Sequence, residues 1–228
     1  MPIKPTLVAL LLALTPIAGA ATEDTEDAWF DADLEARVAA VNEGDLVFLS
    51  EAPADPVHHH HNRMTLDRGS LRDGWVAMTQ CHRHLDAVPR AQIVYHEDRI
   101  RDLAVLSFED IDAVWVEANS VQLTNVRPGA SLCVSARTRA LEANADGSYT
   151  LRSGPFMRRF LDGYYPMRVS MDIEIADGDL RLLGTEPRRQ AGFEVEETGS
   201  GVRLDALFEG RLKTAVHIET DLCQTASC

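Results

Sequence analysis

Apolar and polar positions alternate in short runs along most of this chain. Val114 and Val116, and later Val121 and Leu123, are each separated by one intervening residue. Period-two alternation, in runs rich in β-branched and aromatic residues, is typical of strands with one buried face. The pattern predicts strands over residues 45–50, 74–82, 91–96, 103–108, 114–126, 132–141 and 212–218.

Turn signals join further runs into predicted hairpins, because Gly and Asp-Gly accept the positive φ that tight turns require. Turns spaced this regularly favour antiparallel pairing. The predicted turns are residues 144–147 before a strand over 149–152, residues 176–178 between strands 171–175 and 180–183, and residues 198–201 between strands 193–195 and 202–208.

Helical patterns are sparse. One helix is predicted over residues 31–41, where Trp29, Leu34, Val38 and Val41 recur at about helical spacing. Long amphipathic helices do not alternate with the predicted strands, which argues against a parallel α/β fold. We therefore expect a mainly β fold, an antiparallel β-sandwich or open barrel with one or two short helices. Residues 21–228 are predicted to form a single domain with an acidic N-terminal segment.

The first twenty residues have the features of a secretory signal. A start with Lys4 leads into an apolar run over residues 7–14, and Ala18-Gly-Ala20 resembles a cleavage site. The apolar run is too short to span a bilayer comfortably, so no membrane span is expected. The pattern predicts removal of residues 1–20 and export to the periplasm or beyond.

The formal net charge of −14 changes the list of expected partners. It argues against general nucleic-acid binding and against adsorption to anionic lipid. An envelope protein or a small ligand remains as an expected partner. In an oxidising compartment the four cysteines are expected to form disulfides, most simply Cys81–Cys133 and Cys223–Cys228, although three pairings are possible.

Six of the eight histidines lie between residues 57 and 86. Alternation along a strand places His58 and His60 on one face, and likewise His82 and His84. If the two runs pair as an antiparallel hairpin, with neither strand bulged, one register sets His58 opposite His84 and His60 opposite His82. Four imidazoles on one face would suit copper(II) or zinc. The six histidines are His58, His59, His60, His61, His82 and His84.

The alternative is that the four consecutive histidines are an exposed polar tract without a specific ligand. No catalytic or phosphate-binding motif accompanies them in the sequence. The leading hypothesis is therefore a non-catalytic periplasmic protein that binds copper or zinc. A metal-dependent hydrolase, with histidine as base or zinc ligand, is the less favoured enzymatic hypothesis.

The stretch between Gly154 and Val169 is the second unusual feature, because it concentrates aromatic and cationic residues. A helical turn is expected between Pro155 and Gly163, with Phe156 and Phe160 on one side. The favoured interpretation is an aromatic plug whose arginines pair with surface carboxylates. The alternative is a site for an anionic or carbohydrate-like ligand, or an envelope-assembly surface. The residues of this possible patch are Arg158, Arg159, Tyr164, Tyr165 and Arg168.

Overall fold

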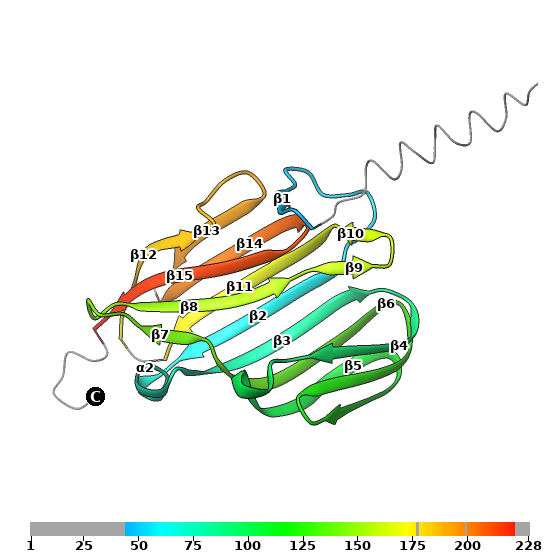
Figure 1. Ribbon diagram of the computed structural model, residues 1–228, viewed down its shortest axis with the longest axis horizontal. Coiled ribbons are helices and arrows are strands. Elements are labelled where there is room, and N and C mark those ends of the chain that lie inside the picture. The colour runs from blue at the N-terminus through cyan, green and yellow to red at the C-terminus, as the bar shows by residue number, and fades with distance from the viewer. Residues whose placement is uncertain (1–43, 177, 199, 222–228) are drawn as a thin grey trace, which may run out of the picture. The chain divides into compact units, whose positions relative to one another are not determined.

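The computed structural model describes residues 44–176, 178–198 and 200–221, and this part of the chain is mainly β-structure (Figure 1). Its helical elements are α2 (Arg68–Asp73) and the 3-10 turn η1 (Glu97–Arg99). The strands are β1 (Val47–Phe48), β2 (His59–Leu66), β3 (Trp75–Leu85), β4 (Val88–Val94), β5 (Ile100–Glu117), β6 (Ser120–Arg139), β7 (Leu141–Ala143), β8 (Tyr149–Phe156), β9 (Arg158–Phe160), β10 (Gly163–Tyr165), β11 (Met167–Ile175), β12 (Leu180–Glu186), β13 (Phe193–Thr198), β14 (Gly201–Glu209) and β15 (Leu212–Thr220).

The larger sheet has nine strands in the order β1-β14-β11-β2-β3-β6-β4, with β13 also paired to β14 and β5 also paired to β6. All these pairs are antiparallel except β2 and β11, which run parallel. The expectation of antiparallel pairing is therefore wrong for this pair. Parallel neighbours need a long crossover, and the chain from α2 to β10 supplies it.

A four-stranded sheet, in the order β12-β15-β8-β7, shares one apolar core with the larger sheet. Met171 of β11 and Leu204 of β14 belong to this core, together with Leu151 of β8 and Val216 of β15. The alternation of buried and accessible positions along β11 shows that one strand face points inward. In the described part of the chain the sheets stay open, and the expected mainly β, sandwich-like fold is confirmed.

The hairpin between β2 and β3 contains a helix that the sequence patterns did not predict. The Asp67 carboxylate accepts a hydrogen bond from the Ser70 backbone N–H at 2.7 Å, and Ser70 Oγ accepts one from the Asp67 N–H. This capping box starts α2, and Gly74, with φ of 77°, ends it. The helix is short, so its hydrophobic period was not visible in the sequence.

Two of the three predicted hairpins are confirmed. Asn144-Ala-Asp-Gly147 connects the antiparallel strands β7 and β8, and β13 pairs with β14 up to Thr198 opposite Gly201. The third hairpin is wrong. Its two strands exist, but β11 belongs to the larger sheet whereas β12 pairs with β15 in the smaller sheet. The turn signal marks the point where the chain passes from one sheet to the other.

The helical turn expected after Pro155 is also wrong. Phe156 stays in the sheet opposite Leu212, and β9 and β10 then form a tight antiparallel hairpin with Phe160 opposite Gly163. Phe156 and Phe160 therefore do not share a face as they would on a helix. Phe156 is 7% exposed and packs into the core, whereas Phe160 is 38% exposed.

Several predictions concern residues that lie outside the described ones. These are the signal peptide over residues 1–20, the acidic segment that follows it, the helix over residues 31–41, and the pair Cys223–Cys228. Among the described helices, none is long and apolar enough to cross a membrane.

Candidate functional site

The histidine-rich segments lie side by side in β2 and β3, which pair antiparallel with His60 opposite His82. In this register His60 and His82 lie opposite each other, as the sequence predicted. Alternation then puts two more cross-strand pairs on the same inner face, Asn62 with Gln80 and Met64 with Met78. The polar side chains on this face are buried, with exposed fractions of 3–8%: His60, Asn62, Gln80 and His82.

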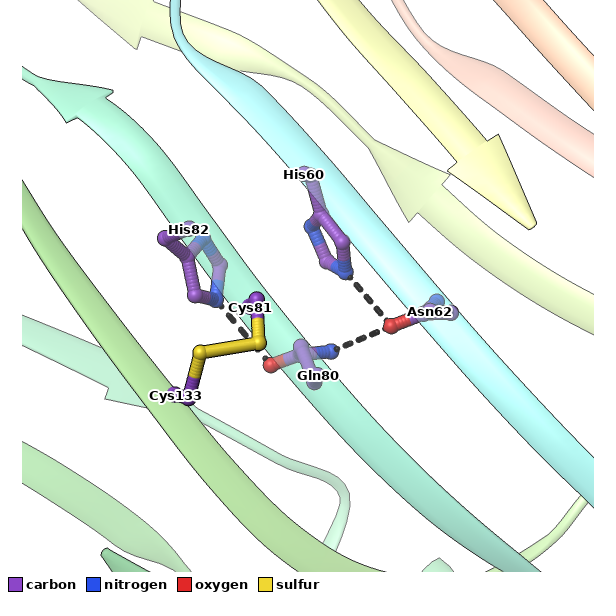
Figure 2. Close-up of a disulfide and its surroundings, with 6 residues drawn as sticks. All are labelled: His60, Asn62, Gln80, Cys81, His82 and Cys133. Atoms are coloured by element: carbon purple, nitrogen blue, oxygen red, sulfur yellow. Dashed lines mark hydrogen bonds between the residues drawn. A yellow bond between two sulfur atoms is a disulfide. The ribbon is translucent and has the colours of Figure 1, made fainter. Parts of the chain in front are cut away.

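Hydrogen bonds connect these buried side chains into one network (Figure 2). Asn62 Oδ1 accepts from Gln80 Nε2 at 3.2 Å, and His60 Nε2 lies 2.9 Å from the same oxygen. Gln80 Oε1 accepts from the Tyr95 hydroxyl at 2.5 Å and lies 3.1 Å from His82 Nε2. His58 Nε2 lies 3.0 Å from His82 Nδ1. We call this network the polar ladder: His58, His60, Asn62, Gln80, His82 and Tyr95.

The bonds of the polar ladder specify which nitrogen of each imidazole carries its proton. A carbonyl oxygen only accepts, so His60 and His82 both donate from Nε2 to the amide oxygens of Asn62 and Gln80. His82 Nδ1 is then the acceptor for a proton donated by His58 Nε2. His82, which donates from Nε2 and accepts at Nδ1, is therefore neutral, and His58 and His60 also carry a proton on Nε2. Because burial lowers the pKa values of His58 and His60 as well, their Nδ1 atoms keep their acceptor capacity.

Burial keeps these imidazoles uncharged at neutral pH. Desolvation lowers the pKa of His60 to about 3 and that of His58 to about 4, and it holds the pKa of His82 well below its ordinary value. Desolvation likewise raises the pKa of the Tyr95 hydroxyl. The polar ladder is thus an uncharged surface made of hydrogen-bonding groups.

His84, the fourth predicted ligand, is not part of the polar ladder. The pairing of β3 with β6 runs regularly to His82 and shifts before Leu85, and His84 lies within this irregularity with φ of 54°. The bulge breaks the strict alternation on which the predicted face depended. His84 is exposed and, with His59, borders a separate groove of about 680 Å³.

His59 and His61 belong to the opposite, outer face of β2. His59 Nε2 contacts Ser170 Oγ, and His61 Nε2 lies 2.8 Å from the Asp172 carboxylate, which also accepts from Arg203 at 2.8 Å. These contacts stabilise the outer surface of the larger sheet. The run of four consecutive histidines therefore divides between two faces of one strand.

The predicted disulfide between Cys81 and Cys133 is present and lies beside the polar ladder (Figure 2). Cys81 and Cys133 are direct partners in the β3–β6 pairing. The bond therefore connects β3 to β6 one residue away from both Gln80 and His82. Neither cysteine is available as a metal ligand.

The polar ladder forms one wall of a cleft of about 1230 Å³. The cleft is also lined by β8 and β15 of the smaller sheet, through residues such as Phe156 and Thr214, and by Gln92, Ile93 and Val94 of β4. The ring of Phe156 meets the His60 ring edge-on at a centroid distance of 4.9 Å. A space of this size accommodates a small organic molecule.

The structure does not bring the four predicted metal ligands together. The rings of His58 and His60 both contact that of His82, with centroid distances of 5.2 and 4.6 Å, but His60 Nε2 is directed at Asn62. In residues 44–176, 178–198 and 200–221, no group of three or more His, Cys, Asp or Glu side chains is arranged to hold a metal ion. What remains is a pair of facing ring nitrogens, His58 Nε2 and His82 Nδ1.

The possible anion patch of the sequence is also divided. Arg158 donates two hydrogen bonds to Asp86, at 2.5 and 2.9 Å, and Arg168 pairs with Asp205 at the groove that His84 borders. These pairings agree with the plug interpretation.

The aromatic residues of this patch are held by the same arginines. The Arg159 guanidinium lies 5.4 Å from the ring centre of Tyr164, whose ring is buried, and that of Arg158 lies 5.6 Å from the ring centre of Tyr165. The patch residues thus contact one another and nearby carboxylates, and they do not surround a common cavity.

Three functional candidates were missed in the sequence: Asn62, Gln80 and Tyr95. A signal for two of them was present, because Asn62 and Gln80 each stand two residues from a ladder histidine, which is the spacing of one strand face. Polar residues at these positions, on a face that continues into Met64 and Met78, indicate a buried polar group that needs partners. Tyr95 carried no such signal, since its contact depends on how β4 packs.

No protein-family model matches this chain, and no curated protein matches its sequence.

Proposed function

We propose that this chain is an exported, non-catalytic binding protein that holds a small ligand in the cleft beside the polar ladder. One observation carries the proposal: a set of neutral, buried, mutually bonded polar side chains forms a wall of a cleft of about 1230 Å³. Burying four hydrogen-bonding side chains and half-burying two more beside an open space costs free energy, which a ligand function would explain. The signal-like pattern of the first twenty residues supports export.

The chemistry of the polar ladder favours binding over catalysis. A histidine whose pKa is about 3 is a weak base at neutral pH, so His60 is poorly suited to general base catalysis. The polar ladder itself contains no carboxylate to orient an imidazole and no hydroxyl or thiol of the kind that acts as a nucleophile in Ser or Cys enzymes. Fixed, satisfied hydrogen-bonding groups are the usual means of orienting a ligand.

A neutral fluorescent probe tests the cleft directly. N-phenyl-1-naphthylamine should bind and increase its fluorescence. Thr138→Trp should weaken this binding about tenfold or more, because Thr138 borders the cleft and an indole would fill it. Thr124→Trp is the matched control, since Thr124 lies on the same strand, is similarly half-buried and does not border the cleft. Equal binding by both variants, or none by the wild type, would reject the cleft as the binding site.

Copper or zinc binding is the second candidate function. It is favoured by the 3.0 Å separation of His58 Nε2 and His82 Nδ1. Two imidazole nitrogens that share a metal at about 2.0–2.1 Å lie about 3 Å apart or slightly more. An ion could therefore replace the shared proton with little movement, and both rings are already in the neutral form that binds metal.

A further inference from the structure

The border of the cleft has the opposite charge balance from the rest of the protein. The whole chain has 36 acidic residues against 22 lysines and arginines. Among the described residues that border the cleft, one carries a carboxylate, Glu186, and four are cationic: Arg99, Arg139, Arg152 and Lys213. Cations gathered at a low-dielectric cleft raise the local concentration of anions even when the net charge is negative.

Most of these charges are not neutralised by protein groups. Arg152 pairs with Glu142 at 2.9 Å, and the Glu186 carboxylate lies 3.6 Å from His217. By contrast, Arg99, Arg139 and Lys213 form no ion pair with another described residue.

The strand register places two of the unpaired cations close to each other. Ile100 of β5 pairs antiparallel with Thr138 of β6, so Arg99, just before β5, and Arg139, at the end of β6, occupy facing backbone positions. Like charges at facing positions repel each other. An anion bound between them would remove this repulsion. Glu97 and Asp98, the acidic residues nearest to Arg99 in sequence, do not border the cleft.

Part of the cleft lining is apolar and adaptable. Met64, Met78 and Met167 border the cleft together with Phe156. Thioether side chains adjust to ligands of different shapes and contact aromatic rings favourably. The cleft therefore offers three kinds of wall: cations at its border, apolar groups within, and neutral hydrogen-bonding groups on the ladder.

We propose that the cleft binds a small organic anion with an apolar or aromatic body. Its acid group lies at Arg99, Arg139 and Lys213, and its body packs against the methionines and Phe156. Acceptor atoms such as Nδ1 of His60 meet any hydroxyl or amide that the body carries. This inference rests on the proposed function, because it names the ligand class for the same cleft.

A matched pair of probes separates the acid group from the body. 8-Anilino-1-naphthalenesulfonate has the same ring system as N-phenyl-1-naphthylamine but carries a sulfonate. In the double variant Arg139→Gln/Lys213→Gln, the affinity for the sulfonate probe should fall about tenfold or more, while that for the neutral probe should stay within about twofold. Sodium chloride should weaken the binding of the sulfonate probe to the wild type, because these exposed charges are screened.

The control is Arg90→Gln/Arg188→Gln, which removes the same charge from exposed residues that do not line the cleft. It should leave both affinities unchanged. Near-UV circular dichroism should show native packing in every variant, since the sulfonate probe also binds loosely packed states. Unchanged sulfonate binding in the cleft variant would overturn the anion inference and leave the cleft intact as a site. If neither probe bound the wild type, the proposed function would fail as well.

Discussion

Cys81 of β3 lies directly opposite Cys133 of β6, and the disulfide between them links the strand of Gln80 and His82 to its second neighbour. On its other side, β3 pairs with β2 through His60 and His82. The strand that carries Gln80 and His82 of the polar ladder is therefore fixed at both edges. Rigid support of this kind holds ligand-contacting groups in place before the ligand arrives.

Removal of the disulfide should destabilise the protein substantially. The two cysteines are 52 residues apart in sequence, and closing a loop of that length in the unfolded chain corresponds to about 4 kcal/mol. Urea denaturation of Cys81→Ala/Cys133→Ala should therefore show a free energy of unfolding lower by about that amount. The wild type in a reducing buffer should behave similarly. A loss below about 1 kcal/mol would mean that the sheet alone fixes β3.

Most of the fold could be predicted from the sequence because strand alternation and turn chemistry are local signals. The β7–β8 turn shows this, since Asp-Gly specifies the hairpin whatever surrounds it. The turn after Ile175 shows the limit. The same type of signal there accompanies a change of sheet, and the choice of partner for β11 depends on packing with β2 and β14. Sequence spacing carries no information on such long-range partners.

The stability of the ligand-free protein should fall as the pH is lowered from about 6.5. The folded-state pKa of His60 is lowered to about 3 by burial, whereas the unfolded chain has the ordinary value of 6.5. Between these values the unfolded state binds the extra proton. The free energy of unfolding is therefore highest above pH 6.5, and it decreases by about 1.4 kcal/mol per pH unit for each such histidine as pH falls.

Between pH 6 and pH 4, His60→Gln should reduce the slope of unfolding free energy against pH by about 1.4 kcal/mol per pH unit, the contribution of one such histidine. The reason is that the Gln amide keeps a donor for Asn62 but does not titrate. The measurement is urea denaturation at a series of pH values. His84→Gln serves as the control at an exposed position. Parallel curves for the wild type and His60→Gln would contradict the burial of a neutral His60.

Phe156 of β8 and Phe160 of β9 should respond very differently to truncation. Phe156 is 7% exposed and contacts the His60 ring, so Phe156→Ala should cost about 3–5 kcal/mol. Phe160, at 38% exposed on the short β9–β10 hairpin, should cost about 1 kcal/mol or less when replaced by Ala. Thermal or urea denaturation measures both. Similar losses would mean that the β9–β10 hairpin packs more tightly than its exposure indicates.

The candidate site was predictable only in part, and His84 explains why. The predicted register correctly brought His60 opposite His82, because hairpin pairing follows from the spacing of two adjacent strands. It failed at His84 because a bulge depends on how β3 fits β6, a strand about fifty residues further along the chain. Asn62 and Gln80 were passed over since uncharged amides do not stand out in a sequence. Their burial is visible only once both sheets are placed.

Metal titrations of single histidine variants distinguish the second candidate function from a polar tract without a specific ligand. If copper(II) or zinc binds between His58 Nε2 and His82 Nδ1, then His58→Ala and His82→Ala should each weaken binding at least about tenfold, because each removes one of two facing donors. His84→Ala should leave the affinity unchanged, since His84 lies at a different groove. Isothermal titration calorimetry of tag-free protein at neutral pH measures all three.

A loss at His84 equal to that at His82 would instead indicate the composite four-histidine site. Isotherms that no single variant changes would indicate loose binding along the histidine run, and the 3.0 Å contact would then be an ordinary hydrogen bond within the polar ladder.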